Sequence, residues 1–293
     1  MTIQTKAEGG TSRLLPDPET EPSKRAYEIY ALAYTPIWIL AFACIVAFGL
    51  YETFDKWSYM KVCVGLSLPY LLQPVLYPSA GTPGSPDEGR PLLERYSFKA
   101  NLWLAIYSFI GNYWYTHYFY SVLHAKYTMP AHRLNNVPLA LYFATHFYFS
   151  TYHVFSNLML RKVVTTFEPG TNRKMLYIAV VGTFAYFTAF METLTISAYP
   201  DYSFEDRNMA YTVGSAFYGI YFIVSFPAFF VFDKEIDSSD ANKKTVTVWD
   251  TVVSSCGYGM IILILLDIVR LYLDIPLVVG SSDVSCFITQ NAL

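Results

Sequence analysis

Apolar runs of about 20 residues recur along this chain, and a run of that length is what an α-helix needs to cross a lipid bilayer. Short clusters of charged residues separate the runs, so only 15% of the 293 residues are charged and 54% are hydrophobic. Seven runs can be delimited, at 29–50, 59–77, 98–121, 137–160, 175–199, 210–232 and 251–273. Because backbone groups in lipid find no water, each run must be helical. We therefore predict an all-α fold, a polytopic transmembrane helix bundle with about seven spans.

Polar segments flank this predicted bundle. Residues 1–25 are rich in Pro and Glu, a composition that is typical of a disordered tail. We expect a transmembrane domain over 26–278 and a C-terminal tail over 279–293. The second run is the weakest, since Pro69 and Pro74 interrupt it.

The positive charges predict an orientation. With the N-terminus on the cytoplasmic side, that side carries 14 Lys and Arg residues and the other side five, while one more lies inside the last run. Cytoplasmic loops carry an excess of positive charge, so we expect a multi-pass protein with a cytoplasmic N-terminus. The net charge of −3 gives no support for a nucleic-acid partner.

Ionisable side chains inside the predicted spans are costly in lipid and are candidates for function by default. They are Glu192, Asp267, Arg270, His117, His146 and His153. Glu192 has no cation within one turn of its own helix. A lone carboxyl group in a low-dielectric site tends to keep its proton, so we interpret Glu192 as an acid. Asp267 and Arg270 are three residues apart, and a structural ion pair is favoured over a catalytic couple there.

Helical spacing places a stripe of polar residues on one face of the fourth run. The stripe consists of Tyr142, His146, Ser150, His153 and Asn157. Such a face must contact protein or a cavity rather than lipid. His153 with Asn157 fits a hydrogen bond between helices as well as it fits a substrate contact.

Depth groups several of these side chains. At about 1.5 Å of rise per residue, His117, Glu192 and Asp267 fall roughly 24–29 Å from the cytoplasmic ends of their helices. Asn112 and His146 fall at roughly 21 Å. Groups from four helices are thus expected in the half of the membrane away from the cytoplasm.

Several kinds of chemistry lack their motifs. The five histidines are separated by 7, 8, 14 and 7 residues, whereas membrane oxygenases need histidines that are adjacent or three to four apart. No phosphate-binding, dinucleotide-binding or G-x-S-x-G motif occurs. We therefore expect no metal and no other cofactor. The remaining acids, imidazoles, amides and aromatic rings can move protons and shelter a carbocation, since aromatic faces attract cations; Tyr113, Trp114 and Tyr218 are candidates for that role.

Seven blocks of the sequence carry a resemblance to a known family. They are "FKANLW" (98–103), "GNYWYTHYF" (111–119), "LNNVP" (134–138), "THFYFSTYHVFSN" (145–157), "ETLTISAYPDYSFEDR" (192–207), "FYGIYFIVSFPAFF" (217–230) and "LLDIVRLYL" (265–273). In order and content they resemble the cycloeucalenol cycloisomerases of plant-type sterol synthesis, over about residues 26–278.

The resemblance implies a membrane isomerase of the endoplasmic reticulum that takes its sterol, cycloeucalenol, from the bilayer. It would open the 9β,19-cyclopropane ring to give obtusifoliol, with no redox cofactor because substrate and product are isomers. Protonation of the cyclopropane carbon that becomes C19 would form a cation at C9, and loss of the C8 proton would leave the 8,9 double bond.

The residue roles are our own assignment from this sequence. The predicted catalytic residues are Glu192, His117, His146 and Asp267. The predicted substrate-binding residues are Asn112, Tyr113, Trp114, His153, Asn157, Tyr218 and Arg270. Three alternatives stay open, namely a sterol double-bond isomerase, a non-catalytic lipid-binding or transport protein, and a structural membrane protein. The sequence does not indicate an oligomeric state.

Overall fold

The computed structural model describes residues 12–76, 84–238 and 244–275, except for the side chains of residues 115–118. The protein is mostly helical. Its helices are α1 (Pro22–Ala47), η1 (Leu50–Thr53), α2 (Lys56–Leu76), η2 (Leu92–Glu94), α3 (Tyr96–Ser121), α4 (Leu139–Thr166), α5 (Thr171–Ser197), α6 (Arg207–Met209), the π-helical η3 (Ala210–Gly214), α7 (Ser215–Val231) and α8 (Val248–Tyr272). Its strands are β1 (Ala125–Tyr127), β2 (Arg133–Leu134), β3 (Val137–Pro138) and β4 (Tyr202–Phe204).

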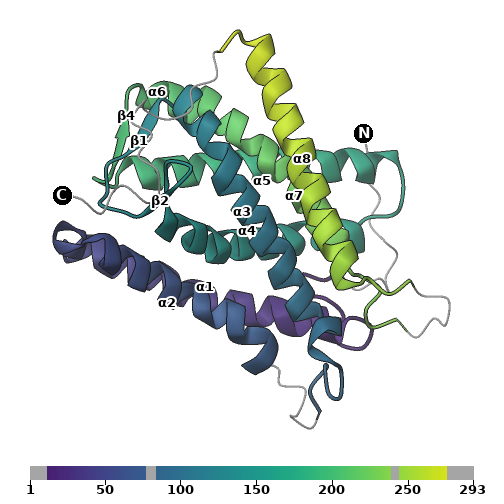
Figure 1. Ribbon diagram of the computed structural model, residues 1–293. Helices are drawn as coiled ribbons and strands as arrows, with labels where there is room; N and C mark the ends of the chain where they lie inside the picture. The colour runs from purple at the N-terminus through teal and green to yellow at the C-terminus, as the bar shows by residue number, and fades with distance from the viewer. Residues whose placement is uncertain (1–11, 77–83, 239–243, 276–293) are drawn as a thin grey trace.

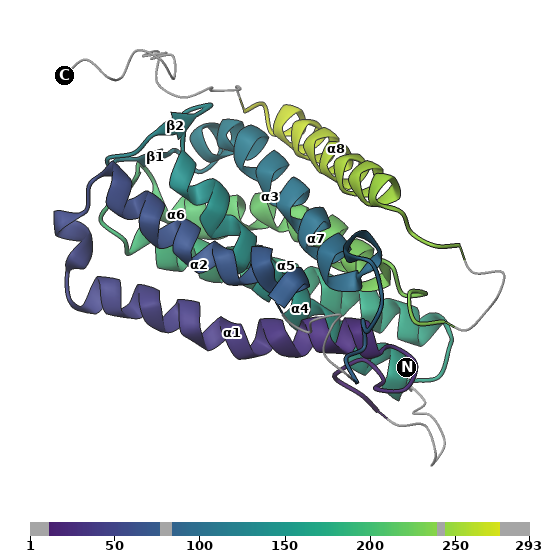
Figure 2. The same ribbon diagram turned by 60° about the horizontal axis from the view of Figure 1, so that its bottom comes forward.

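Helix α4 lies at the centre of the bundle. It packs against α1, α2, α3, α5 and α7, whereas α8 packs against α3 and α7. Figures 1 and 2 show α1 and α8 on opposite sides of the molecule, with the other long helices between them. The polar face of α4 therefore contacts other helices, which is what its sequence pattern required.

Five helices of the described chain are long and apolar enough to cross a membrane: α1, α2, α5, the helical segment Arg207–Val231 and α8. Helices α3 and α4 also lie in predicted spans but fall outside this set. The reason is their polar content. Helix α4, for example, buries the polar side chains of His146, Ser150, His153 and Asn157. The membrane character is thus supported by five helices, and the predicted number of about seven is not confirmed.

The predicted interruption at Pro69 and Pro74 does not divide α2, which runs through both prolines. Side chains of α1 add hydrogen bonds along this stretch. Tyr30 donates its hydroxyl to the carbonyl oxygen of Pro69 at 2.9 Å, and Tyr34 donates to that of Leu66 at 2.8 Å. Proline is tolerated in a packed membrane helix where neighbouring groups supply such bonds.

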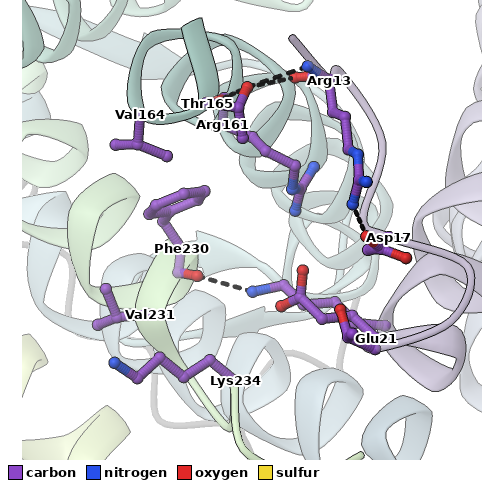
Figure 3. A pocket seen from close by; sticks show the side chains of 11 residues that line it. Arg13, Asp17, Glu21, Arg161, Val164, Thr165, Phe230, Val231 and Lys234 are labelled. Atoms are coloured by element: carbon purple, nitrogen blue, oxygen red, sulfur yellow. Dashed lines mark hydrogen bonds and ion pairs between the residues drawn. The ribbon is translucent and has the colours of Figure 1, made fainter. Parts of the chain in front are cut away.

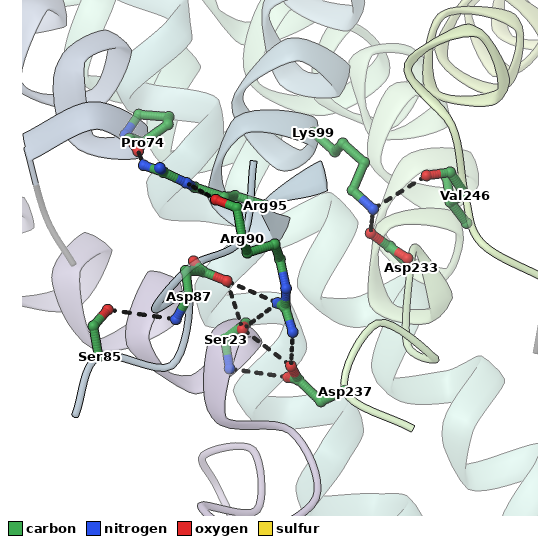
Figure 4. A network of polar contacts seen from close by, with 10 residues as sticks. All are labelled: Ser23, Pro74, Ser85, Asp87, Arg90, Arg95, Lys99, Asp233, Asp237 and Val246. Atoms are coloured by element: carbon green, nitrogen blue, oxygen red, sulfur yellow. Dashed lines mark hydrogen bonds and ion pairs between the residues drawn. The ribbon is translucent and has the colours of Figure 1, made fainter. Parts of the chain in front are cut away.

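A polar network holds the N-terminal end of the bundle, where α1, α3 and α8 begin and α2, α4 and α7 end (Figure 4). Arg90 donates to Asp87 at 2.7 Å and to Asp237 at 3.2 Å, and both carboxylates accept from the hydroxyl of Ser23. Nearby, the ammonium of buried Lys99 pairs with Asp233. The loops at this end are therefore tied to the helices by charge.

Short strands close the opposite end. Strand β1 pairs antiparallel with β4, with Ala125 opposite Phe204. Tyr59 at the start of α2 donates its hydroxyl to Asp201, next to β4. Sequence periodicity did not predict this pairing, because strands of three residues are too short to show an alternating pattern.

Candidate active site

Glu192 lies near the end of α5 and faces two tyrosines from other helices. Tyr218 of α7 donates its hydroxyl hydrogen to Glu192 Oε2 at 2.9 Å. Tyr152 of α4 lies close to the same carboxyl group. Glu192 and Tyr152 are partly accessible, whereas Tyr218 is buried. The carboxyl group thus sits where three helices meet.

Aromatic rings surround this carboxyl group. Phe222 lies one turn after Tyr218, with ring centroids 5.1 Å apart, and contacts Tyr152 edge-on at 5.9 Å. Tyr148 stacks near Tyr152 at 6.4 Å and meets Trp38 of α1 edge-on at 4.7 Å. Aromatic faces attract cations within about 6 Å of the ring centre. We call these residues, Glu192 with Tyr148, Tyr152, Tyr218 and Phe222, the Glu192 cluster.

Small residues bring α7 close enough to form this cluster. A Cβ atom on Gly219 would lie 3.7 Å from the backbone of Ala185, so α5 and α7 are in near contact there. A Cβ atom on Gly111 would lie 3.1 Å from Cε1 of Tyr221, which is tighter than ordinary packing. These contacts hold Tyr218 at hydrogen-bonding distance from Glu192.

His146 points away from the Glu192 cluster, toward α2 and α3. Its Nε2 lies 3.1 Å from Oδ1 of Asn101, whose amide group donates to Gln73 at 3.3 Å. The ring is buried, and its Nδ1 has no hydrogen-bond partner within the described part of the chain. His146 and Glu192 therefore belong to different interfaces of α4, and a direct proton transfer between them is not supported.

His153 and Asn157 make contacts between helices. Nδ1 of His153 donates to the carbonyl oxygen of Phe149 at 2.7 Å, and its Nε2 lies 3.0 Å from the hydroxyl of Ser225. Asn157 donates to Glu28 at 2.9 Å. Both side chains are fully buried. A role for either in binding substrate stays a prediction, and the observed contacts favour the alternative of hydrogen bonds between helices.

The remaining predicted residues of α3 lie near the start of α4. Asn112 donates to the carbonyl oxygen of Ser108 at 2.8 Å and to the hydroxyl of Thr145 at 2.6 Å. Tyr113 and Trp114 are in edge-on ring contact at 5.2 Å. The side chain of His117 lies outside the described residues, so its predicted catalytic role stays a prediction.

Asp267 and Arg270 form the ion pair that their spacing indicates. Arg270 Nε lies 3.2 Å from Asp267 Oδ1, and the guanidinium also donates to the carbonyl oxygen of Ile275 at 2.8 Å. The Asp267 side chain is 50% exposed on α8. This arrangement agrees with the structural interpretation, and it leaves Asp267 outside the Glu192 cluster.

The sequence of the chain is similar to that of a curated protein whose activity is named. Cycloeucalenol cycloisomerase of Arabidopsis thaliana is 39% identical to the chain over 269 residues, which cover 89% of this chain and 91% of that protein.

The chain belongs to the cycloeucalenol cycloisomerase family. This family is one of isomerases, as the resemblance of the seven sequence blocks implied. No protein-family model matches the chain, and no solved structure matches it.

Sequence analysis singled out Tyr218 but missed Tyr148, Tyr152 and Phe222 of this cluster. Tyr148 and Tyr152 are one turn apart on α4, as Tyr218 and Phe222 are on α7. Two aromatic side chains at this spacing in a membrane helix ordinarily indicate packing against lipid or against a neighbouring helix. The signal that distinguishes these two pairs is their convergence on Glu192, which requires three-dimensional contacts.

Within the described residues, no three His, Cys, Asp or Glu side chains come together in a way that could hold a metal ion.

Proposed function

We propose that this chain opens the 9β,19-cyclopropane ring of cycloeucalenol to give obtusifoliol. The observation that carries the proposal is the Glu192 carboxyl group, which accepts a hydrogen bond from Tyr218 and lies among aromatic side chains in a member of this family. The reaction needs a proton donor, a shelter for a cation and a proton acceptor, and the Glu192 cluster can supply all three.

In the proposed reaction, Glu192 transfers its proton to the cyclopropane carbon that becomes C19, and the bond between C9 and that carbon breaks. The positive charge then resides on C9. Loss of the proton on C8 supplies the electron pair of the 8,9 double bond. One proton enters and one leaves, so substrate and product are isomers and no oxidant or reductant is consumed.

The tyrosines act on the carboxylate that the first step creates. Tyr218 donates to Oε2 of Glu192 at 2.9 Å, and in the proposed reaction Oε1 carries the acidic proton. Hydrogen bonds from hydroxyl groups stabilise a carboxylate, so this arrangement favours proton transfer. The same carboxylate is placed to accept the C8 proton, whereas buried His146 faces the opposite side of α4.

The rings of Tyr148, Tyr152 and Phe222 are positioned to stabilise the C9 cation. Only interactions that are stronger in the transition state than with the neutral substrate accelerate the reaction. A developing positive charge meets this condition, because the attraction of an aromatic face for a hydrocarbon increases when the hydrocarbon becomes cationic.

We further propose that α3 and α4 cross the bilayer with the five more apolar helices, giving seven spans and a cytoplasmic N-terminus in the endoplasmic reticulum. The polar side chains of α4 are buried against neighbouring helices, which allows a polar helix to reside in a membrane. The sterol would then reach partly accessible Glu192 sideways from the lipid.

The test is incubation of the purified full chain with cycloeucalenol in heavy water, without added cofactor. We expect obtusifoliol carrying one deuterium in its C19 methyl group. Recovery of unchanged cycloeucalenol would overturn the proposal. A product that lacks deuterium at C19 after a single turnover by protein equilibrated in heavy water would overturn the protonation step. A panel of Δ8 and Δ7 sterols tests the alternative activity of a double-bond isomerase.

An inhibitor pair tests the cation. A sterol-like tertiary amine is protonated near neutral pH and places a positive charge where C9 would carry one. It should inhibit more strongly than a neutral compound of the same shape, and this advantage should shrink as the pH rises above the pKa of the amine. Equal inhibition by both compounds at every pH would contradict a cationic transition state.

A further inference from the structure

A cavity lies at the N-terminal end of the bundle, away from the Glu192 cluster. Its volume is about 330 Å³, and it is bounded by the segment before α1, by α1 itself, and by the ends of α4 and α7 (Figure 3). The charged residues that line it are Arg13, Lys24, Arg161, Lys234, Asp17 and Glu21. Four of these six are cations.

Three of the four cations have carboxylate partners. Arg13 pairs with Asp17. Arg161 holds Glu28 through two hydrogen bonds of 2.7 and 2.8 Å. Lys234 lies 3.8 Å from Glu235 in an exposed pair, and exposed pairs contribute little. Lys24 is thus the one lining cation without an ion pair among the described residues.

Lys24 is the unusual member of this lining. Its side chain is only 2% exposed, and its ammonium donates to the carbonyl oxygen of Phe230 at 2.7 Å. The rings of Phe230 and Tyr96 lie 5.5 and 5.8 Å from Nζ. Within the described chain no carboxylate is in ion-pair distance of this ammonium. An ammonium group has three donors, so two remain after the bond to Phe230.

Burying a cation without an anion is costly, and the cost falls when an anion binds beside it. Phosphate suits this site, since it is a strong acceptor and lysine binds it as a point charge. The end of a helix bundle lies at the level where lipid headgroups are found, and basic pockets between membrane helices bind such headgroups.

We propose that this cavity binds a phosphate group, and that the phosphate is that of a phospholipid headgroup. Lys24 contacts the phosphate from the base of the cavity, and Lys234, whose side chain is 60% exposed, contacts it from the rim. The site is independent of the proposed isomerisation, because the residues that line it and the Glu192 cluster have no member in common.

The test uses the purified full chain in neutral detergent and compares three probes by native mass spectrometry and by titration. The probes are phosphatidic acid, phosphatidylcholine and inorganic phosphate. We expect phosphatidic acid to bind more tightly than phosphatidylcholine. Lys234→Glu should weaken this binding about tenfold, since it reverses the exposed cation at the rim of the cavity. Lys24→Met should also weaken it.

Lys162→Glu is the matched control. Lys162 is an exposed cation at the same end of α4, next to Arg161, but it does not line the cavity. Its reversal should change binding less than twofold. Because Lys234 is exposed, Lys234→Glu should fold normally, and it keeps the test decisive if Lys24→Met does not fold.

Inorganic phosphate can also bind by itself. If Lys234→Glu weakens that binding as much as it weakens the binding of phosphatidic acid, the site is one for free phosphate instead of a lipid. Equal binding of phosphatidic acid and phosphatidylcholine, with no binding of inorganic phosphate, would overturn the proposal. An equal loss with Lys162→Glu and Lys234→Glu would also overturn it, because it would indicate attraction to the whole end of the bundle.

Discussion

Two glutamates enter the bundle on different helices, and their surroundings differ. Glu28 of α1 is fully buried, and its carboxylate accepts two hydrogen bonds from Arg161 and one from Asn157. Glu192 of α5 is partly accessible and meets tyrosine hydroxyls. Glu28 thus has a permanent counter-charge, and within the described residues Glu192 has no ion-pair partner.

This is the difference that we expect between a structural acid and the proposed catalytic acid. A carboxylate that accepts hydrogen bonds from a guanidinium and an amide cannot take up a proton without breaking buried hydrogen bonds. A carboxyl group beside hydroxyl groups and aromatic rings can do so at smaller cost. Substitutions at and around the two glutamates test this difference, and they are ordered from the largest expected effect to the smallest.

The largest effect is expected from Glu192→Gln. Glutamine preserves the shape and can still accept from Tyr218, but it cannot supply the proton. Turnover should fall by about 10²–10⁴-fold, the range of general acid catalysis, while the thermal midpoint stays near that of the wild type. Product formation per folded molecule and a sterol-binding titration measure the two parts. A variant that turns over at the wild-type rate would move the acid to another residue.

Glu28→Gln should produce the reverse pattern. It leaves the Arg161 guanidinium buried without its anion, and loss of one partner from such a pair costs about 3–5 kcal/mol of stability. We expect a clear fall in the thermal midpoint and near-normal turnover in the fraction that stays folded.

The matched control is the double variant Glu28→Gln with Arg161→Met, which removes both charges. It should be more stable than Glu28→Gln alone. If the double variant is less stable, Glu28 and Arg161 act separately and the comparison with Glu192 loses its basis.

The helical fold and the family were predictable from the sequence, and both are confirmed. The long apolar runs and the seven sequence blocks carried that information. Glu28 was missed for a physical reason. The first run was started at residue 29, after a charged cluster, whereas α1 begins at Pro22. Proline is well suited to the first turn of a helix, and burial of Glu28 depends on Arg161, 133 residues away.

The partners of the predicted site residues were less predictable. Spacing placed His146, His153 and Asn157 on one stripe, yet the structure directs them to Asn101, Ser225 and Glu28 on three different helices. Periodicity gives the face of a helix, but it does not give the rotation of the neighbouring helices. The contact between Glu192 and Tyr218 depends on that rotation.

An intermediate effect is expected from Tyr218→Phe. The change removes one hydroxyl donor from Glu192 and keeps the ring beside Phe222. A hydrogen bond of this kind is worth about 0.5–1.5 kcal/mol, or a factor of about 2–10. We expect turnover to fall by about that factor with little change in KM. Tyr221→Phe is the control, since Tyr221 lies beside Tyr218 but donates to the carbonyl oxygen of Gly111 at 3.3 Å.

The smallest effect is expected from Asp267→Asn. The pair with Arg270 is separated by 3.2 Å, and Asp267 is half-exposed, so its loss should cost about 0.2–1 kcal/mol. Arg270 keeps its bond to the carbonyl oxygen of Ile275, and the guanidinium therefore stays anchored. Turnover should remain within about twofold of the wild type, because α8 contributes no side chain to the Glu192 cluster and an exposed pair is weakly coupled to its surroundings. A loss of turnover as large as that of Glu192→Gln would instead make Asp267 a catalytic residue, and it would require the sterol to contact α8.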